Sequence, residues 1–298
     1  MFWGIDLGGT KIEGIVMTDR HPDSVIARYR VDTEAKGGYD HILSRIKYFV
    51  DHLSQMTGHI PNAIGIGTPG TTDPSSGLLK NSNTLCLNDK PLHKDLEKLL
   101  GVKLAMANDA NCFALAEYHL GAVQNQYPYA KVMFGVIMGT GVGGGVVIDG
   151  KIIGGHHGIG GEWGHMFLDE SGEDCYCGRH GCVETIISGP ALQRYYTKHT
   201  GQQKKLVEIL ATPEDPYSIV IRNRLIHFFG KGLGQIINVL DPDVIVLGGG
   251  LAHIDFLYTE GVNEVSKNIF NPILTTPILH PALGDSAGVF GAAILINE

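Results

Sequence analysis

Four soft or borderline metal ligands lie close together in the segment Gly161–Glu184: His165, Cys175, Cys177 and Cys182. Three thiolates and one imidazole are the donor set of a closed tetrahedral zinc site, because these donors suit a borderline-soft ion with no geometric demand of its own. Gly178 and Gly181 precede the last cysteine, where a chain that surrounds a metal must turn tightly. With no ligand position left open, the expected zinc ion is structural.

Disulfides or buried free thiols are the alternative for these cysteines. The chain has five cysteines, an odd number, and its first residues contain no basic stretch or cleavage site typical of a secretion signal. Disulfides are therefore not expected. We expect the protein to reside in the reducing environment of the cytoplasm. Cys86 and Cys112 lie outside the segment and are expected to be ordinary buried thiols.

Two acidic residues bracket the metal ligands, Glu162 before them and Glu184 after them. A structural ion that fixes two carboxylates predicts a preorganised wall of a binding site.

The composition limits the class of protein. The chain has 298 residues, 43% of them hydrophobic and 18% charged, as expected of a soluble globular protein with one large or two ordinary domains. The formal net charge of −8 argues against a nucleic-acid partner. No apolar run is long enough to predict a membrane span.

The first residues predict a β-hairpin with a glycine turn. The strands are expected at 2–7 and 12–17, with Gly8, Gly9, Thr10 and Lys11 between them. Two glycines let backbone N–H groups approach a ligand, and a hydroxyl and a cation follow, so the turn fits a phosphate; an ordinary hairpin turn is the alternative. It is not a Walker A loop, because that spacing and its helix are absent. Asp6, at the end of the first strand, is a candidate for holding Mg²⁺ through water.

A second glycine-rich turn, Gly139–Gly145, follows a strand expected at 131–138. It contains a GxGxxG match, but a strand follows it and no acidic residue lies about 20 positions further on, so a dinucleotide fingerprint is not supported. Two hairpins with glycine turns form a weak internal repeat, which predicts two related domains with phosphates held between them. Three further glycines, Gly248–Gly250, follow an apolar strand and permit an adenine ring to lie against the backbone; close helix–sheet packing is the alternative.

Asp109 follows a strand expected at 102–107 and opens a helix expected to run to about residue 120. Ligands of open α/β sheets bind beyond the carboxyl ends of strands, and an aspartate there can accept a proton from a hydroxyl. A helix cap is the alternative, because Asn and Asp fill that position very commonly.

Taken in order, the motifs resemble those of the ROK family (repressors, open reading frames, kinases) over essentially the full length. They read DLGGTK, GTPG, ANDANCFALAE, GTGVGGG, GEWGH, CYCGRHGCVE, DPDVIVLGGG and GDSAGVFGAA. The resemblance implies an α/β, two-domain actin-like ATPase (ribonuclease H-like) fold with an interdomain cleft and a zinc-binding loop at 161–184. The expected domains are 1–113, joined by a C-terminal helix at 286–298, and 114–285.

The resemblance also implies an ATP-dependent hexose kinase that uses Mg²⁺, phosphorylates the 6-hydroxyl and forms a homodimer. Asp109 resembles the general base. The residues similar to the family's sugar ligands include Asp109 itself. The others are Gly70, Asn83, Asn108, Glu162, His165 and Glu184. The residues similar to ATP and magnesium ligands are Asp6, Gly8, Gly9, Thr10, Lys11, Thr140, Gly141, Gly143, Gly144, Gly145, Gly249 and Gly250.

The choice of sugar stays open at this point. The run from Lys80 to Leu96 and the GEWGH and CYCG variants look closest to ROK fructokinases and mannokinases, so fructose, mannose or glucose is expected. N-Acetyl-D-glucosamine kinases of the same family are the alternative. A sugar-responsive regulator is the alternative of another class, disfavoured because no helix-turn-helix precedes the first strand and because Asp109 and the glycine loops are intact.

Overall fold

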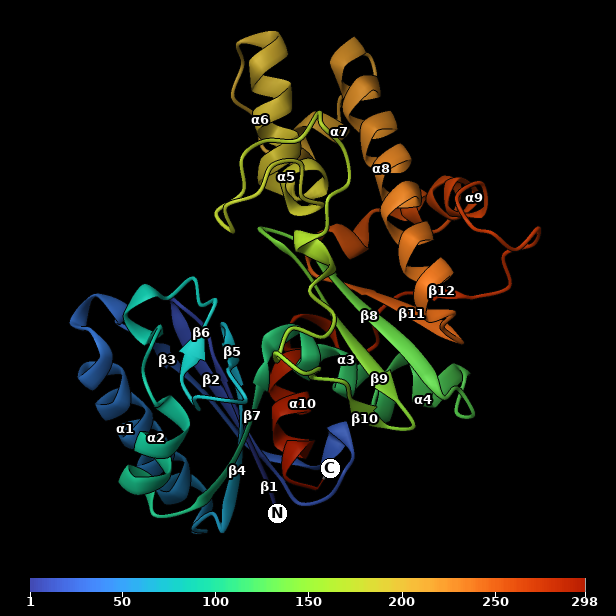
Figure 1. Ribbon diagram of the computed structural model, residues 1–298. Coiled ribbons are helices and arrows are strands. Elements are labelled where there is room, and N and C mark those ends of the chain that lie inside the picture. Colours follow the sequence, from blue (N-terminus) through green and yellow to red (C-terminus); the bar gives the residue numbers. More distant parts are fainter. Residues whose placement is uncertain (298) are drawn as a thin grey trace. The chain divides into compact units, whose positions relative to one another are not determined.

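The N-terminal hairpin forms the middle of a five-stranded sheet in the computed structural model (Figure 1). The strands are β1 (Phe2–Leu7), β2 (Lys11–Met17), β3 (Val25–Asp32), β4 (Ala63–Thr68) and β7 (Lys103–Asn108), in the order β3-β2-β1-β4-β7. β1, β2 and β3 pair antiparallel, whereas β4 pairs parallel with β1 and with β7. The carboxyl ends of β1, β4 and β7 therefore lie at one edge of the sheet.

A second five-stranded sheet repeats this organisation, in the order β10-β9-β8-β11-β12. Its strands are β8 (Val132–Met138), β9 (Val142–Ile148), β10 (Lys151–Ile152), β11 (Val244–Gly248) and β12 (Ile278–Leu279). β10 pairs antiparallel with β9, and β11 pairs parallel with β8 and β12. The internal repeat expected from the two glycine turns is therefore present in the fold.

The structure describes residues 1–297, which group into two compact units. The first contains 1–128, 145–160 and the chain from Ala282 onward; the second contains 129–144 and 161–281. β9 begins in the second unit and ends in the first. These groups differ in extent from the domains expected at 1–113 and 114–285, which remain a prediction.

Five helices and a small hairpin complete the first unit: α1 (Tyr39–Thr57), α2 (Leu92–Leu100), α3 (Asp109–His119), α4 (Ala122–Gln126), α10 (Ala287–Ile294), β5 (Thr71–Thr72) and β6 (Leu79–Lys80). α1 buries Ile42, Ile46 and Phe49 at helical spacing, as its sequence predicts. These side chains join the apolar residues of β1, β2 and β4 in one core.

α10 packs directly on β1, β4 and α3, because glycines remove side chains at the contacts. A Cβ at Gly65 would lie 1.7 Å from the carbonyl oxygen of Ala292, and one at Gly4 would lie 2.4 Å from that of Val289. The C-terminal helix therefore returns to the N-terminal sheet, and Figure 1 shows it beside β1 and α3.

The second unit carries α5 (Glu184–Ile187), α6 (Gly189–Thr200), α7 (Leu206–Leu210), α8 (Pro216–Leu240) and α9 (Glu260–Ser266). α8 begins with Asp215 as its N-cap and ends at Asp241 in the left-handed conformation. Gly230 and Gly234 let α9 and the chain just after it approach α8. A Cβ at Gly230 would lie 2.5 Å from the Glu264 side chain, and one at Gly234 would lie 2.7 Å from that of Asn268.

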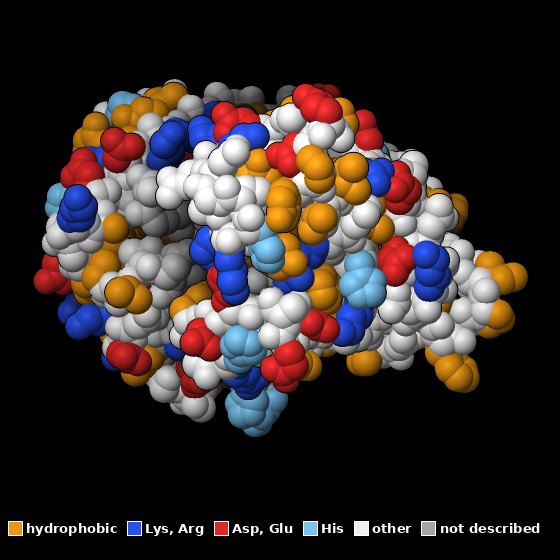
Figure 2. All heavy atoms as spheres, turned by 90° about the horizontal axis from the view of Figure 1, so that it is seen from above, with side chains coloured by type: hydrophobic (Ala, Val, Ile, Leu, Met, Phe, Trp, Pro, Cys, Tyr) orange, Lys and Arg blue, Asp and Glu red, His pale blue; other side chains and the backbone are white. Residues whose placement is uncertain are grey.

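Short 3-10 helices connect these elements: Pro22–Ser24, Ala35–Gly37, Leu85–Leu87, Trp163–His165, Gly250–His253, Asp255–Leu257, Gly284–Ser286 and Leu295–Asn297. None of the described helices combines the length and the apolar character that crossing a membrane requires. On the face in Figure 2, acidic and basic side chains are interspersed, as on an ordinary solvated surface.

Candidate active site

The first glycine turn connects β1 and β2 at the carboxyl end of β1. The amide of Gly8 donates to the carbonyl of Lys11 (2.9 Å), and the hydroxyl of Thr33 donates to the carbonyl of Gly8 (2.7 Å). A Cβ at Gly9 would lie 2.9 Å from the hydroxyl of Thr84, so this position excludes a side chain. Gly9, Thr10 and Lys11 are exposed, which leaves the outer side of the turn accessible to a ligand.

Asp6 lies near the end of β1, next to this turn, and two glycines adjoin its carboxylate. A Cβ at Gly67 or Gly288 would lie 3.5 or 3.8 Å from a carboxylate oxygen of Asp6. Burial, together with the nearby carboxylates of Asp109 and Glu13, raises the pKa of Asp6 to about 7. Such a group of carboxylates attracts a cation, because a positive charge relieves both the desolvation and the mutual repulsion.

Glu13 is itself neutralised by two arginines of β3. The Arg28 Nε donates to Glu13 Oε1 (2.6 Å), and Arg30 forms an ion pair with Oε2. Arg30 also acts on Asp6, lowering its pKa and so opposing the effect of burial. The carboxylate of Glu13 is therefore committed to structure, whereas Asp6 and Asp109 stay available for chemistry.

Asp109 is the first residue of α3, directly after β7. Its neighbour Asn108 is the N-cap, whose side-chain oxygen accepts from the amide of Ala110 (2.9 Å). The cap considered for Asp109 is thus supplied by Asn108, although Asp109 Oδ1 also accepts from Ala110 (2.8 Å). Asp109 remains accessible to solvent, while burial by the protein around it raises the pKa of its carboxyl.

Gly70 and Asn83 lie on the loops that follow β4 and β6. A Cβ at Gly70 would lie 2.6 Å from the carbonyl oxygen of Lys80, so this glycine permits the two loop segments to approach each other. Asn83 Oδ1 accepts a long hydrogen bond from the hydroxyl of Thr84 (3.4 Å), the same hydroxyl that adjoins Gly9. The first unit thus brings Asn83 close to the first glycine turn, and Asp6 close to Asp109.

The second glycine turn lies between β8 and β9. The amide of Gly139 donates to the carbonyl of Gly141 (2.9 Å), and the amide of Val142 donates to Glu184 Oε2 (2.9 Å). A Cβ at Gly141 would lie 2.7 Å from the same carboxylate oxygen. Glu184, expected among the sugar ligands, therefore also fixes the backbone of a turn expected to bind phosphate.

Gly249 and Gly250, expected at the adenosine, lie beside this turn at the end of β11. Gly249 has a φ of 76°, and a Cβ there would lie 2.4 Å from the carbonyl oxygen of Met138. A Cβ at Gly139 would lie 3.6 Å from the amide nitrogen of Gly250. The second unit thus brings the turn around Thr140 together with the glycines that follow β11.

The remaining glycines of the motif lie within β9 and have packing roles. The Trp163 indole donates to the carbonyl of Gly143 (2.7 Å), and a Cβ at Gly144 would lie 2.8 Å from the rings of Phe134 and Trp163. A Cβ at Gly145 would lie 2.8 Å from the carbonyl oxygen of Ala110. Contact of these three glycines with ATP stays a prediction.

The expected zinc ligands form one cluster, in which all four ligand atoms lie within 4.8 Å of one another: His165, Cys175, Cys177 and Cys182. The sulfurs of Cys177 and Cys182 are 3.6 Å apart, and Cys175 Sγ lies 3.4 Å from His165 Nδ1. Zinc–sulfur bonds of about 2.3 Å in tetrahedral geometry separate two sulfurs by about 3.8 Å, so the cluster has the size of a zinc site.

The backbone of the cluster turns where the sequence predicts. Gly178 and Gly181 have φ values of 84° and 71°, which residues with a side chain rarely adopt. Burial raises the pKa of the Cys182 thiol to about 12, so the protein alone does not stabilise a thiolate there. Zn²⁺ supplies the missing charge, and the chemistry of the donor set is consistent with a structural zinc site.

Tyr176 lies between two of the ligand cysteines, and its role was missed in the sequence. Its hydroxyl lies 2.9 Å from His165 Nε2, the ring nitrogen opposite the metal-facing one. Burial raises the pKa of Tyr176 to about 12, with further contributions from the carboxylates of Glu184 and Glu162. The cluster therefore holds a polar wall made of two carboxylates, an imidazole and a phenol. An aromatic residue between two metal ligands was the available signal.

Two sheets of the same strand order, each with a glycine turn after its first long strand, define the class of two-domain actin-like ATPases. A crystal structure of the ROK hexokinase from Thermus thermophilus has the same fold, with a TM-score of 0.87, 31% identity and coverage of 99% of this chain and 97% of that one. A ROK family glucokinase from Streptomyces griseus, solved in complex with glucose and AMPPNP, has a TM-score of 0.80, 27% identity and coverage of 99% and 98%.

Residues 2–298 match the model of the ROK family, and the chain belongs to that family. A curated relative from Histophilus somni, an N-acetyl-D-glucosamine kinase, is 34% identical over 310 residues, covering 99% of this chain and 98% of the relative. These findings confirm the family and the fold class expected from the motifs.

Proposed function

We propose that this protein is an ATP-dependent sugar kinase that transfers the γ-phosphoryl group of ATP to the 6-hydroxyl of a hexose. Asp109 carries the proposal, because it lies at the carboxyl end of β7, close to Asp6 and to the first glycine turn. A phosphoryl transfer requires a positioned hydroxyl, a group that accepts its proton and stabilisation of phosphate charge. We assign the last two roles to Asp109 and the glycine turns, and the positioning of the hydroxyl to the residues that bind the sugar.

Asp109 is proposed as the general base. Burial raises its pKa, which makes the carboxylate a stronger base than an ordinary aspartate. Asn108 fixes the start of α3 and so the direction in which Asp109 projects. The carboxylate accepts the proton of the hydroxyl as the oxygen–phosphorus bond forms.

The two glycine turns and Gly249–Gly250 are proposed to bind ATP. Backbone N–H groups and the Lys11 ammonium face the phosphates, and the absence of side chains permits close approach. Asp6 is proposed to hold Mg²⁺ through its water ligands. Bound Mg²⁺ would neutralise phosphate charge, and the part of Asp6 is to supply a negative charge beside the first glycine turn.

The polar wall around the zinc cluster is proposed to bind sugar hydroxyls. Glu162 and Glu184 accept hydrogen bonds from hydroxyl groups, and His165 offers its Nε2 once Tyr176 exchanges partners. Gly70, Asn83 and Asn108 supply the remaining contacts. A structural Zn²⁺ bound by His165 and the three cysteines holds this wall in place, and a reducing cytoplasm keeps the thiols available.

N-Acetyl-D-glucosamine is the proposed substrate among the hexoses. The motifs favour fructose, mannose or glucose, whereas the curated relative with 34% identity over 310 residues acts, by its name, on N-acetyl-D-glucosamine. The similarity to this relative extends over essentially the whole of both chains, whereas the motif variants cover only short segments. A homodimer is proposed from the family alone, and the mass of the protein in solution tests it.

Product identification tests the reaction and the base together. Purified protein with ATP, Mg²⁺ and N-acetyl-D-glucosamine is expected to give the 6-phosphate by ³¹P nuclear magnetic resonance. Asp109→Asn keeps the shape and the capping oxygen but cannot accept the proton, so we expect turnover to fall about 10²-fold or more, while the melting temperature does not fall. A variant with a third of the wild-type turnover would leave Asp109 without a catalytic role.

A further inference from the structure

A cavity of about 290 Å³ lies within the first unit, beside the edge strand β7 and the first turn of α3. Its walls are partly apolar, from Pro74, Met106 and Leu295, and partly polar, from Thr72, Asn108 and Asn111. One water occupies about 30 Å³ of the liquid, so the cavity accepts a group of several heavy atoms without movement of its walls. Asn108 connects the cavity to the site, because it both lines the cavity and precedes Asp109.

Asn111 is the residue in these walls whose hydrogen bonding is incomplete. The side chain is 6% exposed, and its Oδ1 has no hydrogen-bond partner among the residues that the structure describes. A buried acceptor without a donor is costly, and such groups in folded proteins usually have a ligand or a water. Asn111 lies three residues after Asn108 on α3, so both side chains belong to one face of the helix.

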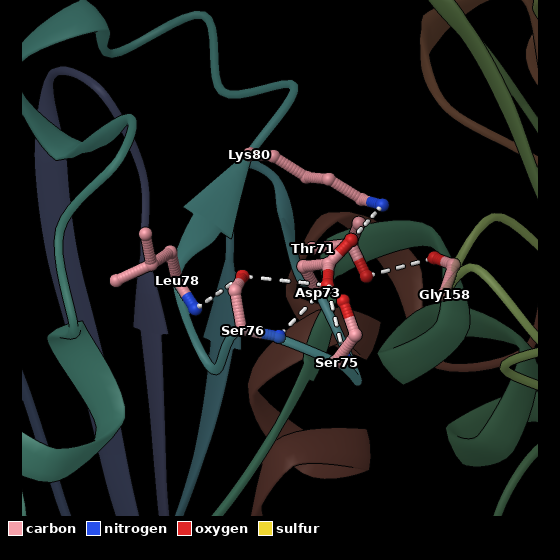
Figure 3. Close-up of polar contacts among 7 residues, drawn as sticks. All are labelled: Thr71, Asp73, Ser75, Ser76, Leu78, Lys80 and Gly158. Atoms are coloured by element: carbon pink, nitrogen blue, oxygen red, sulfur yellow. Dashed lines mark hydrogen bonds and ion pairs between the residues drawn. The ribbon is translucent and has the colours of Figure 1, made fainter.

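The rim of the cavity is a hairpin held by its own polar contacts (Figure 3). Thr71 donates to the carbonyl of Gly158 (2.8 Å), which closes the hairpin against the loop after β10. Asp73 pairs with Lys80 (2.6 Å), and that contact lowers the pKa of the Asp73 carboxyl. These side chains are therefore occupied with structure, whereas Asn111 Oδ1 is buried without a partner among the described residues.

We propose that this cavity is the subsite for the 2-acetamido group of the sugar and that Asn111 is its hydrogen-bonding residue. The inference rests on the proposed function and extends it to the feature that distinguishes N-acetyl-D-glucosamine from glucose. An acetamido group has one N–H donor, one carbonyl acceptor and one methyl. The N–H meets the Asn111 oxygen, and the methyl meets the apolar wall of Met106, Pro74 and Leu295.

The cavity suits this group better than a hydroxyl. A hydroxyl would leave most of the volume and the apolar wall without contact, whereas the acetamido group fills part of it and satisfies the orphan acceptor. A site built to hydrogen-bond a substrate N–H discriminates strongly against the analogue that lacks it, because the buried acceptor is then left unpaired. Asn111 thus determines specificity and takes no part in the proton transfer.

Paired measurements on two sugars test the inference. The dissociation constants of N-acetyl-D-glucosamine and glucose are measured by calorimetry without nucleotide, and kcat/KM by ADP release, for the wild type and Asn111→Ala. We expect the variant to bind N-acetyl-D-glucosamine at least tenfold more weakly and to bind glucose within twofold of the wild type. Asn125→Ala, an exposed position on α4, is the matched control and should change neither.

The outcomes separate the inference from the proposed function. An equal loss for both sugars, or no loss for either, overturns the acetamido subsite, since Asn111 would then support the fold or a water. Absence of ADP release by the wild type with every sugar overturns the kinase, while calorimetry still decides the subsite. If Asn111→Ala does not fold, Thr72→Leu narrows the cavity from its rim, and the same selective loss is expected.

Discussion

At the scale of single residues, the first unit holds two aspartates whose carboxyls resist ionisation. Asp6 and Asp109 both have raised pKa values, with burial as the main cause, and Asp109 contributes to the shift of Asp6. An ionised Asp6 is costly to the fold, because its charge is poorly solvated and the charge of Asp109 repels it. The Mg²⁺–ATP site that we propose here would account for this cost.

The ionisation of Asp6 predicts how stability depends on pH. The folded-state pKa of about 7 exceeds the unfolded value of about 3.8, so the folded protein binds the proton more tightly. The contribution of Asp6 to stability is therefore greatest below pH 4, declines between pH 4 and 7 and is constant above. Asp6→Asn removes this loss of stability. The free energy of unfolding should rise by a few kcal/mol at most, because one pKa unit corresponds to about 1.4 kcal/mol.

Melting temperatures without added Mg²⁺ or nucleotide measure this effect. Asp6→Asn is expected to melt at a higher temperature than the wild type at pH 8, with a difference that shrinks as the pH falls toward 4. Parallel profiles for the two proteins over that range would show that Asp6 ionises normally.

Glu117 is expected to stabilise the fold. This side chain is fully buried in α3 and accepts hydrogen bonds from the amides of Ala122 (2.8 Å), Ala282 (3.0 Å) and Leu283 (2.9 Å). It thus ties α3 to the segment that leads into α10. Gln replaces one acceptor oxygen by a donor, so Glu117→Gln should lower the free energy of unfolding by about 1–3 kcal/mol.

Urea unfolding of Glu117→Gln and of the exposed control Glu214→Gln measures the difference. The control should stay within about 0.5 kcal/mol of the wild type. A Glu117→Gln loss no larger than that of the control would mean that the three amides find other acceptors.

At the scale of elements, the two glycine hairpins and the zinc cluster were predictable, and the contacts that join them were not. Short periodic patterns fix the strands of a hairpin, and ligand spacing fixes the Cys/His cluster. The bond from Val142 to Glu184 and the distribution of the GTGVGGG glycines between the turn and β9 depend on packing between distant segments. Local sequence carries no signal for such contacts.

Some residues of α3 could be predicted from the sequence, and others could not. Its start and the position of Asp109 follow from the pattern of strand, Asn and Asp. Asn111 and Glu117 were overlooked, although they are polar residues on a helix that is apolar on every face. Polar residues on such a helix are buried and need hydrogen-bond partners. Their presence in an otherwise apolar helix was the available signal. Which partners they have depends on the fold of distant segments, Ala282 and Leu283 among them.

The Cys/His cluster predicts a bound zinc ion whose removal destabilises the protein. Elemental analysis should give about one zinc per chain, and a chelator should lower the melting temperature markedly, since structural zinc contributes on the order of 10 kcal/mol to folding. Cys177→Ser should reproduce the effect, because it removes one ligand of the cluster, whereas Cys86→Ser, outside the cluster, should not. A zinc-free protein with unchanged melting would contradict the structural metal.

At the scale of the whole molecule, the candidate site falls into two groups, one in each unit. The first holds the proposed base, the first glycine turn and the acetamido subsite; the second holds the second turn, Gly249–Gly250 and the zinc cluster. The family and the paired sheets could be predicted from the sequence because the motifs extend along the full chain. The sugar could not, because the cavity that we assign to its substituent is built from segments between residues 68 and 295.

The most direct measurement is the specificity constant of the wild-type protein for four sugars, from ADP release with N-acetyl-D-glucosamine, glucose, mannose and fructose. The Asp109 base, the glycine turns and the acetamido cavity together predict ATP-dependent turnover, with kcat/KM for N-acetyl-D-glucosamine at least tenfold above that for glucose. Turnover of fructose or mannose in preference would contradict the substrate assignment. No turnover of any of the four would contradict the kinase itself.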